Sequence, residues 1–211
     1  MLRTEFIPAR QPAKSNCLLI ALHGLGDSLA GYRWLPDELG LPWLNILLVN
    51  APDPYFGGFS WYDFAGNPGP GILRSRQLLF DLLDHQARQG FPTELTSLFG
   101  FSQGCLMTVD VGFRYPKKLS GLIGVSGYVH EPEVLLAGLS PVARSQRMLF
   151  THGTQDPLVP CAAVREQVQI LQKAGLNITW KEFEKVHTIA GTQELDLLRT
   201  FIADGYPGIE R

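Results

Sequence analysis

Cysteine is scarce in this sequence, and the few cysteines are too scattered to build a disulfide framework or a metal site. Cys17, Cys105 and Cys161 are three in 211 residues, and an odd, widely spaced set is not typical of a disulfide-rich secreted protein. No Cys-X-X-Cys pair or Cys/His cluster has the spacing of metal ligands, so we expect no metal. Cysteine usage of this kind predicts a protein of the reducing cytoplasm.

An excess of positive charge is also missing. The chain has 18 basic and 20 acidic side chains and a formal net charge of −2. Nucleic-acid binding depends on neutralising many phosphates with Lys and Arg, and anionic lipid attracts runs of the same residues. We therefore expect no nucleic-acid partner and no basic cluster that would hold the protein at a membrane surface.

Long hydrophobic runs are absent as well. The longest early run, Cys17–Leu22, has six residues. That is too short for a secretory signal or a membrane-spanning helix, so we expect no integral membrane association. Hydrophobic residues nevertheless make up 45% of the chain. At this length one large core is more stable than two small ones, which predicts a single domain over residues 1–211.

Short hydrophobic runs bounded by Gly, Pro, Asn or Asp recur along the chain and predict β-strands. They are Cys17–Leu22, Ile46–Asn50, Ser97–Phe101, Leu122–Val125, Met148–Thr151 and Ile178–Phe183. All but the last are nearly continuous rather than alternating, which is typical of strands buried on both faces of a parallel sheet.

Segments with a helical period of apolar residues lie between some of these runs. They are Ser75–Gln89, Gln103–Phe113, Ala162–Ala174 and Thr192–Ala203. Strands alternating with helices predict an α/β fold, with a mostly parallel central sheet, helices on both faces and right-handed crossovers. Residues Asp53–Gly71 have no period and are rich in Pro, Gly and aromatic residues, so we expect a long functional loop there.

The segment Gly100–Gly104 reads Gly-Phe-Ser-Gln-Gly and matches the G-x-S-x-G pattern of a nucleophilic serine. A predicted strand precedes it and a predicted helix follows, which puts Ser102 on the sharp turn between them. Side chains beside such a turn collide unless they are glycines, and the helix N-terminus favours a developing negative charge. We predict that Ser102 is a catalytic nucleophile; a chance match in a glycine-rich chain is the alternative.

A serine hydroxyl becomes a strong nucleophile only when a base takes its proton. His187 follows the last predicted strand and precedes the last predicted helix, so its loop lies with Ser102 at the carboxyl edge of the sheet. We predict that His187 is the base. The other histidines lie on a polar helix, in a loop without an orienting partner, or before glycines at strand ends: His85, His130, His23 and His152.

A third group must orient the imidazole and stabilise its charged form. Asp156 lies in a loop directly after a buried strand, and it stands between the nucleophile and the base in the chain. Asp110 is a rival, but eight residues into a helix it lies about 12 Å away along the axis. Asp27 and Asp63 remain possible although both precede the nucleophile. For Asp156 itself, a purely turn-forming role is the alternative.

Backbone N–H groups must stabilise negative charge on the reacting carbonyl oxygen. The amide of Gln103, directly after the nucleophile, is one candidate. The loop Leu22–Asp27 contains two glycines that allow its backbone to turn inward, and the amide of Leu25 is the second candidate. An ordinary glycine turn is the alternative reading of this loop.

Motifs spread over residues 17–205 resemble the phospholipase/carboxylesterase family of α/β-hydrolases, which includes the acyl-protein thioesterases. The matching segments are Leu22–Asp27, Asn50–Pro52, Trp61–Asp63, Gly100–Gly104, Ser126–Tyr128, Gly153–Pro160 and His187. The resemblance implies an α/β-hydrolase fold without a cap domain. It also implies a triad of Ser102, Asp156 and His187, with the amides of Leu25 and Gln103 as the oxyanion hole.

Two features depart from the family pattern. Val186 stands before the catalytic histidine where the family usually has glycine, which leaves the path of this loop open. The stretch Asp53–Ser60 is shorter than in the eukaryotic thioesterases, where the region helps to form the acyl-binding channel. We therefore expect a short acyl pocket. The aromatic residues expected either to contact the substrate or to pack this loop are Tyr55, Phe56, Phe59 and Trp61.

Together these features predict a cofactor-free serine carboxylesterase or thioesterase. Its substrates would be small-molecule acyl esters or acylated molecules with short to medium acyl chains, cleaved through an acyl-enzyme. An acyl-protein thioesterase or lysophospholipase acting on long acyl chains is an alternative, as is a peptidase or C–C hydrolase, because fold and triad do not determine the leaving group. A non-catalytic α/β-hydrolase-fold binding protein is a further alternative. No oligomeric state is predicted.

Overall fold

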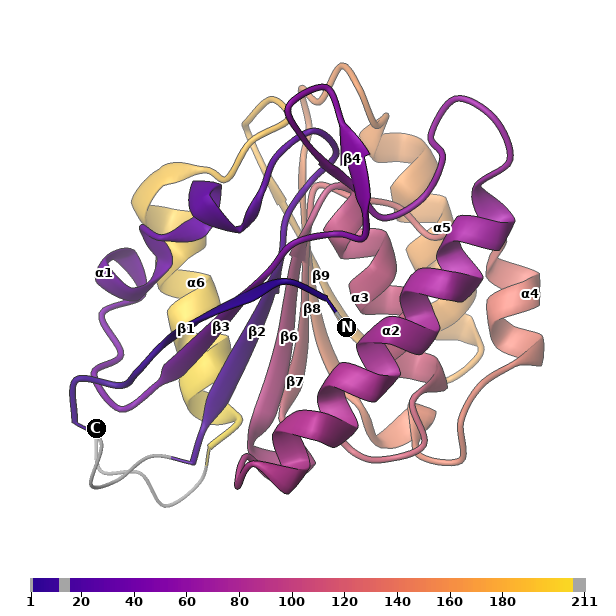
Figure 1. Cartoon of the computed structure of the whole chain (residues 1–211). Coiled ribbons are helices and arrows are strands. Elements are labelled where there is room, and N and C mark those ends of the chain that lie inside the picture. The colour runs from indigo at the N-terminus through magenta and orange to yellow at the C-terminus, as the bar shows by residue number, and fades with distance from the viewer. Residues whose placement is uncertain (1, 12–15, 207–211) are drawn as a thin grey trace.

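A seven-stranded sheet forms the centre of the computed structural model, which describes residues 2–11 and 16–206 (Figure 1). In spatial order its strands are β1 (Thr4–Ile7), β3 (Asn45–Val49), β2 (Leu18–Leu22), β6 (Thr96–Phe101), β7 (Gly121–Val125), β8 (Arg147–Gly153) and β9 (Asn177–Phe183). β1 is antiparallel to β3, and all other neighbours are parallel. The mostly parallel sheet expected from the sequence is confirmed.

Burial explains which strands could be predicted. Every residue of β2, β3 and β7 is buried, which produces the continuous hydrophobic runs seen in the sequence. The edge strand β1 was not predicted. Its four residues alternate between exposed and half-buried positions, so it carries too few apolar residues to form such a run.

Helices cover both faces of the sheet (Figure 1). On one face lie α1 (Leu35–Leu39) and α6 (Gly191–Asp204), and on the other lie α2 (Pro68–Arg88), α3 (Gln103–Arg114), α4 (Pro132–Ala137) and α5 (Cys161–Lys173). Short 3-10 helices are η2 (Leu29–Tyr32), η3 (Thr93–Leu95) and η4 (Ala143–Ser145). The expected three-layer arrangement is therefore present.

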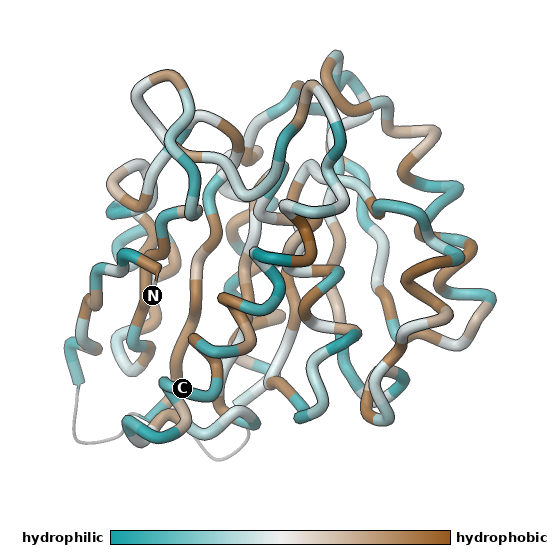
Figure 2. The backbone as a smooth tube through the Cα atoms, turned by 45° about the vertical axis from the view of Figure 1, so that its right-hand side comes forward, coloured by the Kyte–Doolittle hydropathy of each residue, from teal (hydrophilic) through white to brown (hydrophobic). Residues whose placement is uncertain are grey.

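Two hydrophobic cores result, one on each side of the sheet. Alternate residues of one strand point to opposite cores, so that Leu98 packs toward α2 and α3 whereas Phe99 packs toward α1 and α6. In Figure 2 the central strands are largely hydrophobic, while the outer helices alternate between hydrophilic and hydrophobic residues. This pattern is what one buried helix face and one solvated face produce.

The segment Asp53–Gly71 is more ordered than the expected loop. It contains the antiparallel hairpin of β4 (Asp53–Tyr55) and β5 (Gly58–Ser60). Moreover, α2 begins at Pro68 rather than at Ser75, because the Asn67 side chain caps it, accepting a hydrogen bond from the Gly69 amide at 3.1 Å. The prediction treated these prolines as loop signals, whereas proline also suits the first turn of a helix.

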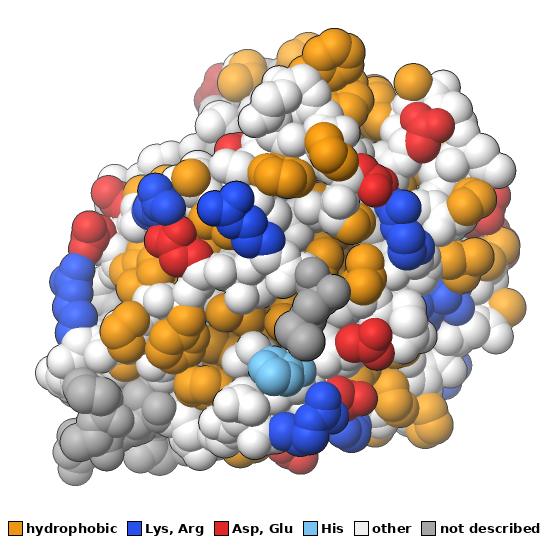
Figure 3. All heavy atoms as spheres, in the orientation of Figure 1, with side chains coloured by type: hydrophobic (Ala, Val, Ile, Leu, Met, Phe, Trp, Pro, Cys, Tyr) orange, Lys and Arg blue, Asp and Glu red, His pale blue; other side chains and the backbone are white. Residues whose placement is uncertain are grey.

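The carboxyl ends of the parallel strands point to the edge drawn at the top of Figure 1. Hydrophobic side chains are exposed in the loops at this edge (Figure 3); they include Phe56, Phe64, Leu158 and Val186. Within the described ranges, no helix has the length and apolar character needed to cross a bilayer.

Candidate active site

Ser102 occupies the sharp turn between β6 and α3 that its sequence context predicts. Its backbone has φ 53° and ψ −115°, a strained conformation for a residue with a side chain. The flanking glycines permit this turn. A Cβ on Gly100 would lie 2.0 Å from the Gly104 carbonyl oxygen, and one on Gly104 would lie 2.2 Å from the Leu22 carbonyl oxygen.

The three side chains expected to form a triad come together at the carboxyl edge. His187 Nε2 lies 3.0 Å from Ser102 Oγ, and His187 Nδ1 lies 2.7 Å from Asp156 Oδ2. Ser102 and His187 are half-buried, while the Asp156 carboxylate is fully buried. Val186 is exposed, so its side chain does not prevent the following imidazole from reaching Ser102.

Asp156 makes the contacts of both roles that the sequence left as alternatives. Its Oδ1 accepts hydrogen bonds from the Leu158 and Val159 amides, both at 2.9 Å, and so forms a turn. Its Oδ2 faces the His187 ring. Burial favours the neutral carboxyl, but the hydrogen bonds from Val159, His187 and Leu158 outweigh burial, so the pKa of Asp156 lies below its ordinary value. The group is therefore an anion at neutral pH.

The rival aspartates have other partners. Asp110 binds Arg76 Nε at 2.6 Å and Arg114 Nε at 3.0 Å. Asp27 accepts from the Ser28 amide at 2.7 Å. Asp63 Oδ1 accepts from the amides of Ala65 and Gly66 and stabilises a turn.

The rival histidines shape loops. His23 Nδ1 lies 2.6 Å from the Gly24 carbonyl oxygen, and its Nε2 accepts from the Ala51 amide at 3.0 Å. His152 Nε2 lies 2.9 Å from the Val159 carbonyl oxygen. Burial lowers the pKa of both rings, which keeps them neutral. Neither is within hydrogen-bond distance of the serine hydroxyl.

The first oxyanion candidate, Gln103, directly follows the nucleophile in the chain. Gln103 is the first residue of α3, where a backbone N–H has no partner within the helix. Its side chain is held by the segment after β5: Oε1 accepts from the Trp61 amide at 3.0 Å, and Nε2 donates to the Tyr62 carbonyl oxygen at 3.0 Å.

The β4–β5 hairpin supports the loop that carries Leu25. The Gly26 amide donates to the Phe59 carbonyl oxygen, and the Phe59 amide donates to the Asp27 carbonyl oxygen, both at 2.9 Å. The contact is so close that a Cβ on Gly58 would lie 2.0 Å from the Gly26 carbonyl oxygen. The hairpin thus holds the backbone on both sides of Gly26 in place.

The expected aromatic substrate contacts have different environments. Trp61 is fully buried in one hydrophobic core, and its indole N–H donates to the His23 carbonyl oxygen at 2.9 Å. Phe56 is 95% exposed at the hairpin tip. Tyr55 packs edge-on against Phe56, with ring centroids 4.8 Å apart. Phe59 is half-buried near the His23 ring.

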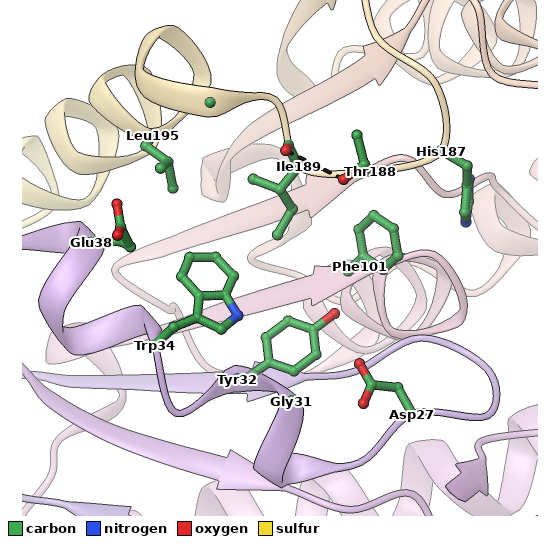
Figure 4. Close-up of a pocket in the computed structure, with 11 residues that line it drawn as sticks. Asp27, Gly31, Tyr32, Trp34, Glu38, Phe101, His187, Thr188, Ile189 and Leu195 are labelled. Carbon is green, nitrogen blue, oxygen red and sulfur yellow. Dashed lines mark hydrogen bonds between the residues drawn. The ribbon is translucent and has the colours of Figure 1, made fainter.

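A cavity of about 510 Å³ adjoins His187, and none of these four aromatic residues lines it (Figure 4). It lies between the segment before and within α1 and the loop that leads from His187 into α6. Its lining comprises Asp27, Gly31, Tyr32, Trp34, Glu38, Phe101, His187, Thr188, Ile189, Gly191 and Leu195. Most of these residues belong to no motif; the apolar stripe of α6, which includes Leu195, was the available signal.

No group of three or more His, Cys, Asp or Glu side chains could hold a metal ion within residues 2–11 and 16–206. The site consists of a hydroxyl, an imidazole and a carboxylate, with the imidazole within hydrogen-bond distance of the other two groups. Such a set can carry out nucleophilic acyl transfer without a metal.

Comparisons with known proteins agree with this chemistry. The family model for phospholipase/carboxylesterase matches residues 4–204. Acyl-protein thioesterase 1 of Yarrowia lipolytica is 30% identical over 207 residues, covering 88% of this chain and 91% of the relative. A probable carboxylesterase of Oryza sativa subsp. japonica is 27% identical over 211 residues, covering 92% and 79%.

The crystal structure of esterase PE8 is similar in fold, with a TM-score of 0.82 and 26% identity over 97% of this chain and 99% of that one. Together with the sheet order, this similarity confirms the expected α/β-hydrolase fold. No cap domain covers the sheet edge in the described part of the chain.

Proposed function

The chain belongs to the phospholipase/carboxylesterase family of hydrolases, and we propose that it is a serine esterase or thioesterase working through an acyl-enzyme. The observation that carries this proposal is the unbroken pair of hydrogen bonds through His187, 3.0 Å to Ser102 Oγ and 2.7 Å to Asp156 Oδ2. The names of the relatives, acyl-protein thioesterase and carboxylesterase, support the reaction class.

In the first half-reaction Ser102 Oγ attacks the acyl carbonyl carbon while His187 Nε2 takes the hydroxyl proton. Asp156 accepts a hydrogen bond from Nδ1–H, which sets the tautomer and stabilises the imidazolium. The amides of Gln103 and Leu25 donate to the oxyanion, each contributing about 3 kcal/mol to the transition state.

Collapse of the tetrahedral intermediate breaks the bond to the leaving oxygen or sulfur, which receives the proton held on His187 Nε2. Water then enters, loses a proton to the same nitrogen and attacks the acyl-enzyme carbonyl. The acid is released and Ser102 regains its hydrogen. Each proton therefore passes through one ring nitrogen, and no external co-reactant except water is needed.

A fluorophosphonate probe tests the nucleophile. We expect a single adduct on Ser102 of the folded protein, no adduct in Ser102→Ala, and turnover reduced by about 10⁶-fold in that variant. His187→Ala should slow labelling strongly, whereas His85→Ala, on α2, should label like the wild type. Equal labelling of the two histidine variants would refute the proposed base.

Short to medium acyl chains are the substrates that we propose. The compact β4–β5 hairpin is engaged with the Gly26 backbone, and Trp61 is buried, so this region offers little wall for a long acyl channel. A series of p-nitrophenyl esters should give the highest kcat/KM between butyrate and octanoate. A maximum at palmitate would instead favour the long-chain thioesterase or lysophospholipase.

Matched ester, thioester and amide substrates with one acyl group separate the remaining reaction classes. We expect ester and thioester to be hydrolysed and the amide to react far more slowly. An amide rate that equals the ester rate would assign the site to a peptidase.

A further inference from the structure

The cavity beside His187 has no role in the chemistry described above. It lies between residues 27–38 and 187–195. We propose that this cavity receives the leaving alcohol or thiol of the substrate and favours a cationic leaving group. The inference rests on the proposed hydrolase function, because it assigns a subsite of the same reaction.

The position of the cavity relative to the imidazole indicates the leaving group. The leaving atom must accept a proton from His187 Nε2, so it lies within hydrogen-bond reach of that nitrogen. His187 and the three residues Thr188, Ile189 and Gly191 that follow it form one wall, and Phe101, the residue before the nucleophile, contributes to the floor. A group that departs on the imidazole side therefore enters this cavity.

Its size and walls suit an organic leaving group. About 510 Å³ lies within the usual range of small-ligand sites, roughly 300–1,000 Å³. Trp34, Ile189 and Leu195 provide apolar surface (Figure 4). The Trp34 ring is stacked on Tyr32, with centroids 6.2 Å apart, and aromatic faces attract cations.

The charged side chains of the cavity lining also favour a cationic leaving group. Asp27 and Glu38 carry carboxylates in the lining, and no Lys or Arg is among the described residues that form it. In Figure 4 Asp27 lies on the His187 side, while Glu38 lies at the opposite end with Leu195. Arg199 donates to the backbone oxygens of Glu38 and Leu39 and pairs with the Asp196 carboxylate. A positive leaving group is thus attracted along the whole cavity.

A pair of isosteric esters tests the charge preference. Butyrylcholine and 3,3-dimethylbutyl butyrate share an acyl group and differ in the charge of the leaving alcohol. After normalisation to hydroxide-catalysed rates, we expect the wild type to favour butyrylcholine in kcat/KM by about three- to tenfold. Glu38→Gln should reduce this preference by about two- to fivefold, through a lower kcat/KM for butyrylcholine.

Asp37→Asn is the matched control. Asp37 is adjacent on α1 and exposed, but it pairs with Arg10 outside the cavity. The control removes the same charge and should keep the preference of the wild type. If the two variants lower the preference equally, the effect comes from the overall negative charge of this surface. That result would overturn the proposal that the leaving group binds in the cavity. Equal rates of the wild type on the two esters would also overturn it.

Leu195→Trp tests which half of the substrate occupies the cavity. By filling space, it should lower kcat/KM for bulky leaving groups at least tenfold and leave the acyl-chain profile with p-nitrophenyl esters unchanged. A shifted acyl-chain profile would mean that the cavity holds the acyl chain, which overturns the inference. Fluorophosphonate labelling of Ser102 in every variant keeps this outcome separate from failure of the proposed function.

Discussion

At the residue scale, Asp156 joins a turn-forming contact to a contact with the proposed base, His187. Oδ1 stabilises the turn after β8, while Oδ2 orients the imidazole. An amide in place of the carboxylate could retain the turn through its oxygen, but it would present an N–H to His187 or select the wrong tautomer. The two roles can therefore be separated by a conservative substitution.

We expect Asp156→Asn to lower kcat by about 10⁴-fold, because the imidazole loses its orienting anion. The melting temperature should fall only slightly, since the Asn oxygen can still accept the two turn hydrogen bonds. Asp63→Asn is the control, because Asp63 also forms a turn through one oxygen and lies outside the triad. Steady-state kinetics beside thermal unfolding distinguishes the variants; equal activity in both would contradict the role of Asp156.

Ser102, Asp156 and His187 could be predicted because each lies at or just after the carboxyl end of a parallel strand, and these ends meet at one edge of the sheet. The environment of His23 could not be predicted in the same way. Its ring is held between the Gly24 carbonyl oxygen and the Ala51 amide, which belong to segments that follow different strands. Such contacts depend on the tertiary fold and leave no local pattern.

The two buried histidines predict a loss of stability in acid. His23 Nε2 accepts a hydrogen bond from the Ala51 amide, which a proton on that nitrogen would break. His152 Nδ1 is buried without a hydrogen-bond partner, so a proton there would find no acceptor. Burial lowers the pKa of both rings below the ordinary histidine value. As the pH falls through that ordinary value, the unfolded chain takes up these protons before the folded chain does, so the free energy of unfolding decreases.

Urea unfolding between about pH 7.5 and pH 5 should show this slope, up to about 1.4 kcal/mol per pH unit for each histidine. His23→Gln should be less stable at neutral pH but should show a shallower slope. His85→Gln, on α2, should retain the slope of the wild type. A slope unchanged by His23→Gln would contradict the assignment to that ring.

At the element scale, the β4–β5 hairpin is the largest departure from the expected loop. Its sequence contains the Pro, Gly and aromatic residues that usually indicate irregular structure, and each of its strands has only three residues. The hairpin is stabilised chiefly by tertiary contact with Gly26 and Asp27. Strands and helices with a buried face were predictable, whereas elements defined by such contacts were not.

The same hairpin predicts a long-range effect on catalysis. In Gly58→Ala the new Cβ would lie 2.0 Å from the Gly26 carbonyl oxygen, so the hairpin must move away from the loop that carries the Leu25 amide. We expect a roughly 10- to 100-fold loss of kcat through a misplaced oxyanion donor. KM should change much less, because the binding walls are not altered.

Gly57→Asn is the control for this change. Gly57 has φ +89°, a conformation that Asn tolerates better than other residues, and no atom lies within 4 Å of a Cβ there. This variant should keep kcat near that of the wild type. If Gly58→Ala retains full kcat, the hairpin does not position the oxyanion loop.

At the scale of the whole molecule, a buried ion pair connects the loop that carries His187 to the helix α6. Lys185 Nζ donates to both carboxylate oxygens of Glu194 in α6, at 2.6 and 2.8 Å, and both side chains are almost fully buried. Glu194 Oε2 also accepts from the Ala190 amide. Lys185 and Ala190, on either side of His187 in the chain, thus both donate to the Glu194 carboxylate.

Sequence patterns did not reveal this connection, because Lys and Glu are usually exposed and these two lie on different elements. The cavity beside His187 has the same origin. Its lining combines residues near α1 with residues of the loop before α6, and only the tertiary fold brings these distant segments together. Features formed by contacts between distant segments thus require the structure, whereas a residue at the end of one strand can be predicted from the sequence.

The ion pair between Lys185 and Glu194 predicts that stability and kcat can be separated by mutation. Lys185→Met leaves a buried carboxylate unpaired and should reduce the free energy of unfolding by about 3–5 kcal/mol. The double variant Lys185→Met/Glu194→Met removes both charges and should recover most of that loss. It should not recover kcat, because the Ala190 amide has lost its acceptor and the His187 loop is no longer fastened.

Urea unfolding and steady-state kinetics on the two variants measure the two effects separately. Arg165→Met is the control, since it breaks a more exposed pair with Glu182 and should change neither quantity appreciably. Recovery of kcat together with stability in the double variant would mean that the ion pair stabilises the fold without positioning His187. Persistent loss of kcat in a stable double variant would instead identify Glu194 as a positioning residue, because the imidazole must be held within hydrogen-bond reach of Ser102 for the proton to transfer.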